Sequence, residues 1–170
     1  MRFLKLSLIS FLILFFIVTV IGLLFPSTVT VSRAIEVASS RDTIYKFLSD
    51  VKYWKLWMAG ADSNTILFLS ARTAGEGTVA KIGTGEVTMI RTTRDSIYTV
   101  WKSAKGNVQN GVFTVMPNLK DSNITVQWYF AQKLEWYPWE RFGSMANDKI
   151  LGPVMEQSFD KLKKILEAKK

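Results

Sequence analysis

An uncharged apolar segment near the amino terminus constrains this chain more than any other feature. Residues Leu6 to Phe25 carry no charge, and sixteen of these twenty residues are Leu, Ile, Phe or Val. An α-helix of twenty residues extends about 30 Å, which matches the hydrocarbon core of a bilayer. The sequence therefore predicts a transmembrane anchor over 6–25, preceded by a short tail (1–5) and followed by one domain (28–170).

The same segment also sets an expected orientation. It is longer than the stretch of about 7–15 apolar residues in a cleaved signal peptide, and Phe25-Pro26 follows it where small residues would be needed for cleavage. We therefore favour an uncleaved, single-pass anchor over a cleaved signal. Arg2 and Lys5 precede the segment, whereas Arg33 is the sole basic residue among the fifteen that follow. Because basic residues stay on the cytoplasmic side, we expect a cytoplasmic amino terminus and an extracytoplasmic domain.

Composition narrows the chemistry of the domain. The chain has no cysteine and no histidine, which excludes disulfides, thiolate nucleophiles and Ser-His-Asp or Cys-His catalysis within this one chain. We expect no metal and no cofactor, and lean towards a protein that is not an enzyme. The net charge of +8 favours anionic headgroups as a partner. We expect no nucleic acid, since the basic residues are dispersed apart from a carboxyl-terminal cluster, and no protein partner can be named.

Hydrophobic periodicity predicts one strand, two short helices, six further strands and a long helix. Thr28–Val37 alternates as a strand does. Ser39 or Ser40 offers a helix N-cap, and Asp50 starts a second helical turn. The long helix covers 139–168, and Gly152-Pro153 is expected to kink or divide it. The six intervening strands are predicted at Thr65–Ala71, Thr78–Ile82, Glu86–Thr93, Ser96–Lys102, Val108–Met116 and Asn123–Trp136.

This order predicts an α+β fold in which consecutive hairpins form a curved antiparallel sheet of seven strands around the long carboxyl-terminal helix. Such a sheet needs the amphipathic helix to cover its concave face, and space between the two is where a ligand would bind.

Four segments in the same order resemble the START-like, polyketide cyclase-dehydrase-like (SRPBCC) superfamily with its helix-grip fold. The resemblance covers about residues 28–168. One departure is that Trp57-Met58-Ala59-Gly60 lacks a proline common near the second tryptophan of family members. The four segments are Asp50-Val51-Lys52-Tyr53-Trp54-Lys55-Leu56-Trp57, Gly83-Thr84-Gly85-Glu86-Val87-Thr88-Met89-Ile90, Asn123-Ile124-Thr125-Val126-Gln127-Trp128, and Phe159-Asp160-Lys161-Leu162-Lys163-Lys164-Ile165-Leu166-Glu167.

The resemblance implies a cavity that binds a hydrophobic small molecule or lipid, with enzymatic activity in some branches only. Our first hypothesis is thus a membrane-anchored binding module for a hydrophobic or lipid-like molecule. The alternatives are a cyclase- or dehydratase-type enzyme that uses a cavity carboxylate, and a cavity-free interaction domain of the cell envelope.

Large apolar side chains on the expected concave face and the buried helix stripe are the cavity candidates, although each would serve equally as core. They are Trp54, Trp57, Trp101, Phe113, Trp128, Met155 and Phe159. Under the enzymatic alternative, a carboxyl group in an apolar cavity would act as acid or base. The candidates for that role are Glu86, Glu135 and Asp62. Trp136, Tyr137 and Trp139 cluster before the long helix, where they either cap the sheet or reach headgroup depth.

Overall fold

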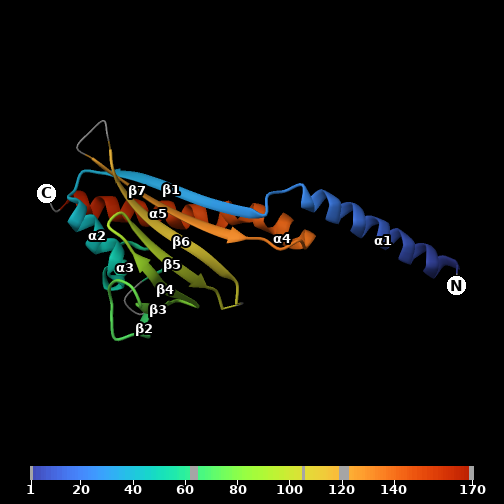
Figure 1. Cartoon of the computed structure of the whole chain (residues 1–170), viewed down its shortest axis with the longest axis horizontal. Helices are drawn as coiled ribbons and strands as arrows, with labels where there is room; N and C mark the ends of the chain where they lie inside the picture. Colours follow the sequence, from blue (N-terminus) through green and yellow to red (C-terminus); the bar gives the residue numbers. More distant parts are fainter. Residues whose placement is uncertain (1, 62–64, 105, 119–122, 169–170) are drawn as a thin grey trace.

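One antiparallel sheet and one long helix form the domain, and an apolar helix leaves it at one end (Figure 1). The computed structural model describes residues 2–61, 65–104, 106–118 and 123–168. The elements in chain order are α1 (Arg2–Leu23), β1 (Thr28–Val37), α2 (Arg41–Ser49), η1 (Val51–Tyr53), α3 (Trp54–Trp57), β2 (Ile66–Phe68), β3 (Val79–Ile82), β4 (Gly85–Thr92), β5 (Ser96–Lys102), β6 (Val108–Pro117), β7 (Ile124–Lys133), α4 (Pro138–Gly143), η2 (Ser144–Ala146) and α5 (Asn147–Glu167).

The sheet order is β1-β7-β6-β5-β4-β3-β2, so the first strand pairs with the last. Thr28 lies opposite Lys133 and Val37 opposite Ile124, which gives β1 and β7 an unbroken ten-residue register. The remaining strands follow one another as hairpins, as predicted. Val126, Trp128 and Phe130 are buried on one face of β7, which confirms the predicted alternation.

Two predicted strand limits were wrong, and each has a local cause. β2 ends at Phe68 instead of residue 71, because the Ser70 hydroxyl accepts from the Val79 N–H (2.9 Å) and donates to the Arg72 carbonyl (2.7 Å). Such side-chain bonds compete with a strand ladder. β7 ends at Lys133 instead of residue 136, because its partner strand β1 begins at Thr28 and leaves one more in-register bond, from the Leu134 N–H to the Ser27 carbonyl at 2.8 Å.

The short helices begin where the sequence predicted caps. Ser40 is the N-cap of α2, and its hydroxyl accepts from the Thr43 N–H at 3.3 Å. Asp50 caps η1 by accepting from the Lys52 N–H at 3.1 Å. These caps satisfy N–H groups that the first helical turn leaves without partners.

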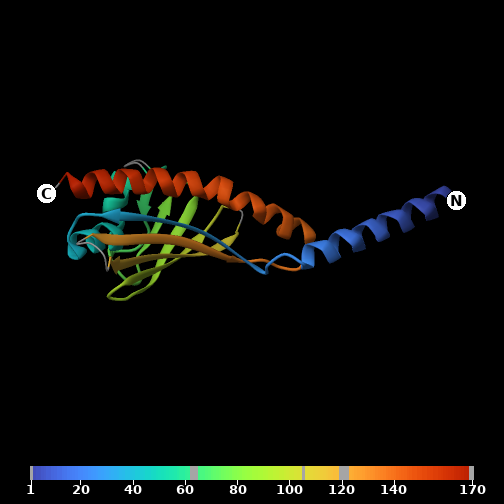
Figure 2. The same cartoon turned by 90° about the horizontal axis from the view of Figure 1, so that it is seen from above.

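The long helix α5 covers the concave face of the sheet along the length of the domain (Figure 2). Arg33 of β1 joins it to the sheet through hydrogen bonds to Asp148 (2.9 Å) and Glu156 (2.6 Å). Both bonds raise the pKa of Arg33 above its ordinary value, and the bond to Asp148 has the larger effect. Gly152 lies under this contact, since a Cβ there would collide with the guanidinium of Arg33.

Pro153 does not divide the helix, contrary to one of the two expected outcomes. It lies inside the continuous α5, and the division falls earlier, at η2. The carbonyl that loses its bond to the missing proline N–H belongs to Lys149, which is exposed and therefore open to water.

The helix α1 extends away from the domain (Figures 1 and 2). Among the described residues it is the one helix long and apolar enough to cross a membrane, and Gly22 is its one buried residue. Its 22 residues extend about 33 Å.

The cap at Ser40 provides a test of the fold. We expect Ser40→Ala to lower the free energy of unfolding by about 1 kcal/mol, measured by urea unfolding of the full chain in detergent with tryptophan fluorescence. Ser39→Ala is the matched control, because the structure gives Ser40 the cap. Equal effects of the two substitutions would contradict the assignment.

Candidate functional site

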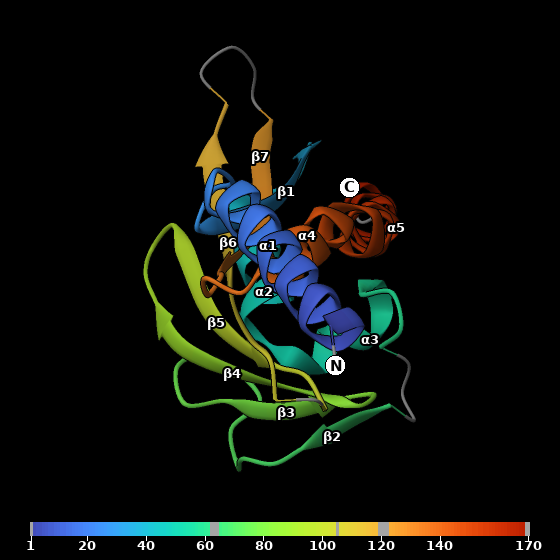
Figure 3. The ribbon, with the colours of Figure 1, turned by 90° about the vertical axis from the view of Figure 1, so that its right-hand side faces the viewer.

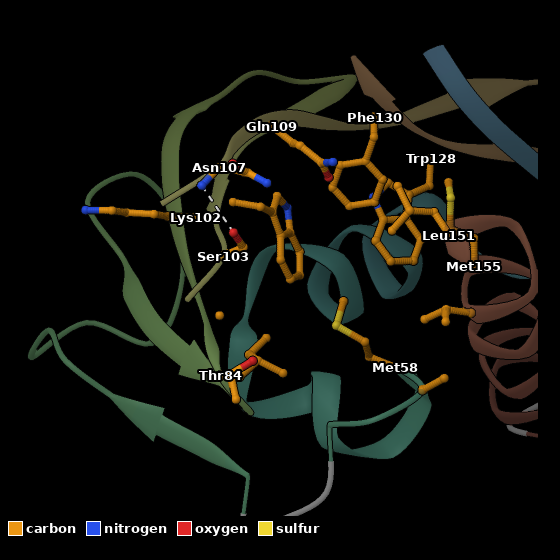
Figure 4. Close-up of a pocket in the computed structure, with 15 residues that line it drawn as sticks. Met58, Thr84, Lys102, Ser103, Asn107, Gln109, Trp128, Phe130, Leu151 and Met155 are labelled. Atoms are coloured by element: carbon orange, nitrogen blue, oxygen red, sulfur yellow. Dashed lines mark hydrogen bonds between the residues drawn. The ribbon is translucent and has the colours of Figure 1, made fainter. Parts of the chain in front are cut away.

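A cavity of about 360 Å³ lies between the sheet and the first half of α5. Its apolar wall contains Trp101 of β5, Trp128 and Phe130 of β7, and Leu151 and Met155 of α5 (Figure 4). The volume is near the lower end of the range of small-molecule pockets. It equals about twelve times the share of one water molecule in the liquid.

The space under the second half of α5 is filled by an aromatic core. Trp54 stacks on Trp101 with ring centroids 5.7 Å apart. Phe113 stacks on Trp128 at 5.0 Å, and Phe159 of α5 meets Trp128 edge-on at 6.1 Å. Trp101 and Trp128 therefore belong to both regions: each ring packs on the core and also forms the wall of the cavity.

This division separates the predicted cavity residues. Trp101, Trp128 and Met155 line the cavity. The remaining four candidates lie fully buried in the core, and they are Trp54, Trp57, Phe113 and Phe159. Hydrogen bonds allow the two tryptophans to be fully buried. The Trp54 indole donates to the Leu48 carbonyl (2.9 Å), and the Trp57 indole donates to the Phe47 carbonyl (3.2 Å).

One polar group of the cavity wall is buried without a partner. Trp128 is 2% exposed, and its indole N–H has no hydrogen-bond acceptor among the described residues. The neighbouring Trp101 indole, in contrast, donates to the Thr99 hydroxyl at 2.9 Å. A buried unpaired donor costs about 1–3 kcal/mol, and this N–H is itself buried, so it does not face the open space of the cavity.

The rim of the cavity is polar and comes from two hairpins. It contains Thr84 of the β3–β4 turn, Ser103 and Asn107 of the β5–β6 turn, and Gln109 of β6. Gln109 donates to Gln132 at 3.1 Å, and Gln132 also accepts from Asn147 of α5 at 3.1 Å. Lys102 belongs to the lining, but its ammonium points away from the cavity (Figure 4).

The strand register places this rim at the end of the sheet where α1 is attached. Lys102 pairs with Val108, and Glu86 pairs with Lys102. The end of β7 at Lys133 lies at the same end of the sheet, opposite Thr28, the first residue of β1 after α1. Figure 3 looks along α1 onto this end and shows how far the sheet curls between β1 and β2.

Two of the three predicted acid–base candidates, Glu86 and Glu135, lie outside the cavity. Glu86 is exposed on β4 between Lys81 and Lys102 of the neighbouring strands. Glu135 is exposed beyond the end of β7, where its N–H donates to Glu140 at 2.8 Å. Asp62 lies outside the described residues. Among the described residues, no carboxylate lines the cavity and no group of His, Cys, Asp and Glu suited to a metal is present.

Several lining residues were missed at the sequence level. Met58 and Ala59 follow α3 and line the cavity, and the departure from the family pattern at 57–60 was a signal for them. The Ala59 N–H is fixed by the Ser158 hydroxyl of α5 at 2.9 Å. Leu151 lies on the predicted buried stripe of the long helix, four residues before Met155, but periodicity did not separate cavity from core there. Val154 lies beside that stripe, so periodicity gave no signal for it.

Comparisons with known proteins show the fold alone. The sequence matches no protein-family model and no curated protein. Solved structures share its architecture at low identity. One is a protein from Nitrosospira multiformis (TM-score 0.64, 11% identity, 84% of this chain and 100% of that one). Another is a norcoclaurine synthase point mutant from Thalictrum flavum in complex with a transition-state analogue (0.62, 16%, 84% and 97%). A third is a protein of unknown function from Staphylococcus aureus (0.61, 13%, 84% and 96%). With the seven-stranded sheet and closing helix, these likenesses support the expected helix-grip fold.

Gly111 of β6 provides a test of how the cavity wall is built. A Cβ at this position would lie 2.7 Å from the Thr99 hydroxyl, 2.8 Å from the Trp101 indole nitrogen and 3.0 Å from Phe130. We expect Gly111→Ala to destabilise the domain by about 1–3 kcal/mol, because three well-packed groups must move.

The matched control is Gly143→Ala, where a Cβ would meet nothing within 4 Å. Its helical backbone accepts alanine, so we expect little change or a small gain in stability. Urea unfolding of the two full-length variants measures the difference. A Gly111→Ala variant as stable as the control would show that Trp101 does not need the close approach to β6.

Proposed function

We propose that this protein is a membrane-anchored binding module for a hydrophobic or lipid-like small molecule held between the sheet and α5. The observation that carries the proposal is the aromatic cavity under the first half of α5. Apolar walls with a few placed polar groups are typical of small-molecule sites. The preferred ligand has an apolar, largely flat body.

The anchor supports the same proposal. A ligand of this kind partitions into lipid, and α1 would keep the cavity close to the bilayer where such a ligand is most concentrated. The cavity rim lies at the sheet end nearest α1, which shortens the path between bilayer and cavity. Flexible methionine side chains, Met58 and Met155, adapt to ligands of differing outline.

The two other hypotheses receive less support. A cyclase or dehydratase would place a carboxyl group in the cavity, and the described lining residues contain none. A cavity-free interaction domain would be packed throughout, whereas here the core fills the space under one half of α5 only.

Filling the cavity tests the proposal directly. Leu151→Trp replaces an aliphatic side chain of the cavity wall with a larger indole ring. We expect the affinity for 2-naphthol to fall at least about tenfold, equivalent to about 1.4 kcal/mol. Binding is measured by equilibrium dialysis of the full chain in nanodiscs, with protein-free nanodiscs to subtract partitioning into lipid. Leu67→Trp is the control, since Leu67 is exposed on the edge strand β2. The proposal fails if the wild-type chain shows no saturable binding of 2-naphthol, of fatty acids or of lipids retained on purification.

A further inference from the structure

A group of aromatic residues, three exposed and one half-buried, surrounds α4 at the end of the domain from which α1 leaves. We call Trp136, Tyr137, Trp139 and Phe142 the α4 foot. The Tyr137 ring stacks on Trp139 at 5.0 Å and contacts Trp136 at 4.7 Å. Trp139 is 62% exposed and Trp136 is 50% exposed. The foot takes no part in the cavity described above, and stacked exposed aromatic rings of this size suggest a surface that is covered in use.

The foot is fixed to the end of α1. The buried Arg141 guanidinium donates to the Phe25 carbonyl at 2.6 Å and to the Glu135 carbonyl at 2.8 Å. Phe25 also meets Phe142 edge-on at 5.5 Å. Gly22 faces α4, where an added Cβ would lie at an ordinary van der Waals distance of 3.5 Å from Pro138. The bonds hold α4 beside α1. They also give Arg141, the one cation of α4, hydrogen-bond partners within the protein.

An apolar hollow separates the foot from α1. It is lined by Phe11, Leu14, Phe15 and Val18 of α1 and by Pro138, Trp139 and Phe142 of α4. Its α1 wall, residues 11–18, lies in the middle of the predicted membrane span 6–25, about 10 to 21 Å along the helix axis from Phe25. A bilayer that α1 crosses therefore reaches the α4 foot.

We infer that the α4 foot is a second membrane contact that reaches below the headgroups, with acyl chains filling the hollow beside α1. Tryptophan and tyrosine favour the upper part of this layer, next to the headgroups. The occupant of this surface is the phospholipid bilayer, and the cavity rim is consequently held at the membrane surface.

The absence of cysteine makes the contact measurable. A single Phe142→Cys substitution in the full chain carries a nitroxide at a known position, and Trp136→Cys provides a second site should the first variant fold poorly. Leu67→Cys on β2, equally apolar and exposed, is the control. Each labelled chain is placed in nanodiscs of phosphatidylcholine and phosphatidylglycerol. Collisions of the nitroxide with oxygen, which concentrates in lipid, are compared with collisions with a water-soluble nickel complex.

At positions 142 and 136 we expect frequent collisions with oxygen and a loss of collisions with nickel relative to position 67. Adding Trp139→Ser should restore nickel access at 142, whereas adding Ile90→Ser on β4 should not. Nickel access at 142 and 136 equal to that at 67 overturns the inference. Shielding from both reagents, with dipolar broadening between labels, would instead show a second copy of the chain on this surface and overturns it as well. The measurement needs no ligand, so its result is independent of whether the cavity binds 2-naphthol.

Discussion

The pairing of the first strand with the last is the contact on which the rest of the structure depends. Ten residues of β1 lie in register with ten of β7, so the chain's first segment after α1 is fixed to its last strand. The first strand, β1, also carries Arg33, whose bonds to Asp148 and Glu156 hold α5 over the sheet. Anchor, closing helix and cavity rim therefore meet at one end of the domain as a consequence of one ladder.

The balance between core and cavity is decided by where large rings meet α5. Trp54, Trp57, Phe113 and Phe159 interlock under the second half of the helix, and burial of rings of this size dominates the energetics of a core. Towards the first half, the sheet curls away and smaller side chains on α5 leave space open. A wall built from Trp101 and Trp128 is rigid because both rings also belong to that core, which pre-organises the cavity and lowers the entropy cost of binding.

Much of the fold, but less of the site, could be predicted from the sequence. Alternation and turn residues located β1 and β5 to the residue, since strands with one buried face have a strong period. The cavity wall was harder to predict, because strand parity treats every inward-facing ring on the sheet as equivalent. Parity placed Phe113 and Trp101 as the same kind of candidate, yet one is core and the other lines the cavity. The difference comes from the curl of the sheet and the position of α5, which are long-range properties.

The junction between anchor and domain shows why a short linker need not be flexible. Residues 24–27 have no regular structure, yet the carbonyl of Phe25 accepts from Arg141 and that of Ser27 from Leu134. Backbone carbonyls bonded on both sides of Pro26 leave little freedom for the domain to swing about α1. The tilt of α1 in a bilayer would therefore set the orientation of the whole domain, and with it the position of the cavity rim. Loss of the Arg141 bonds would free that orientation without removing the anchor, so membrane attachment and membrane-facing orientation are separable properties of this chain.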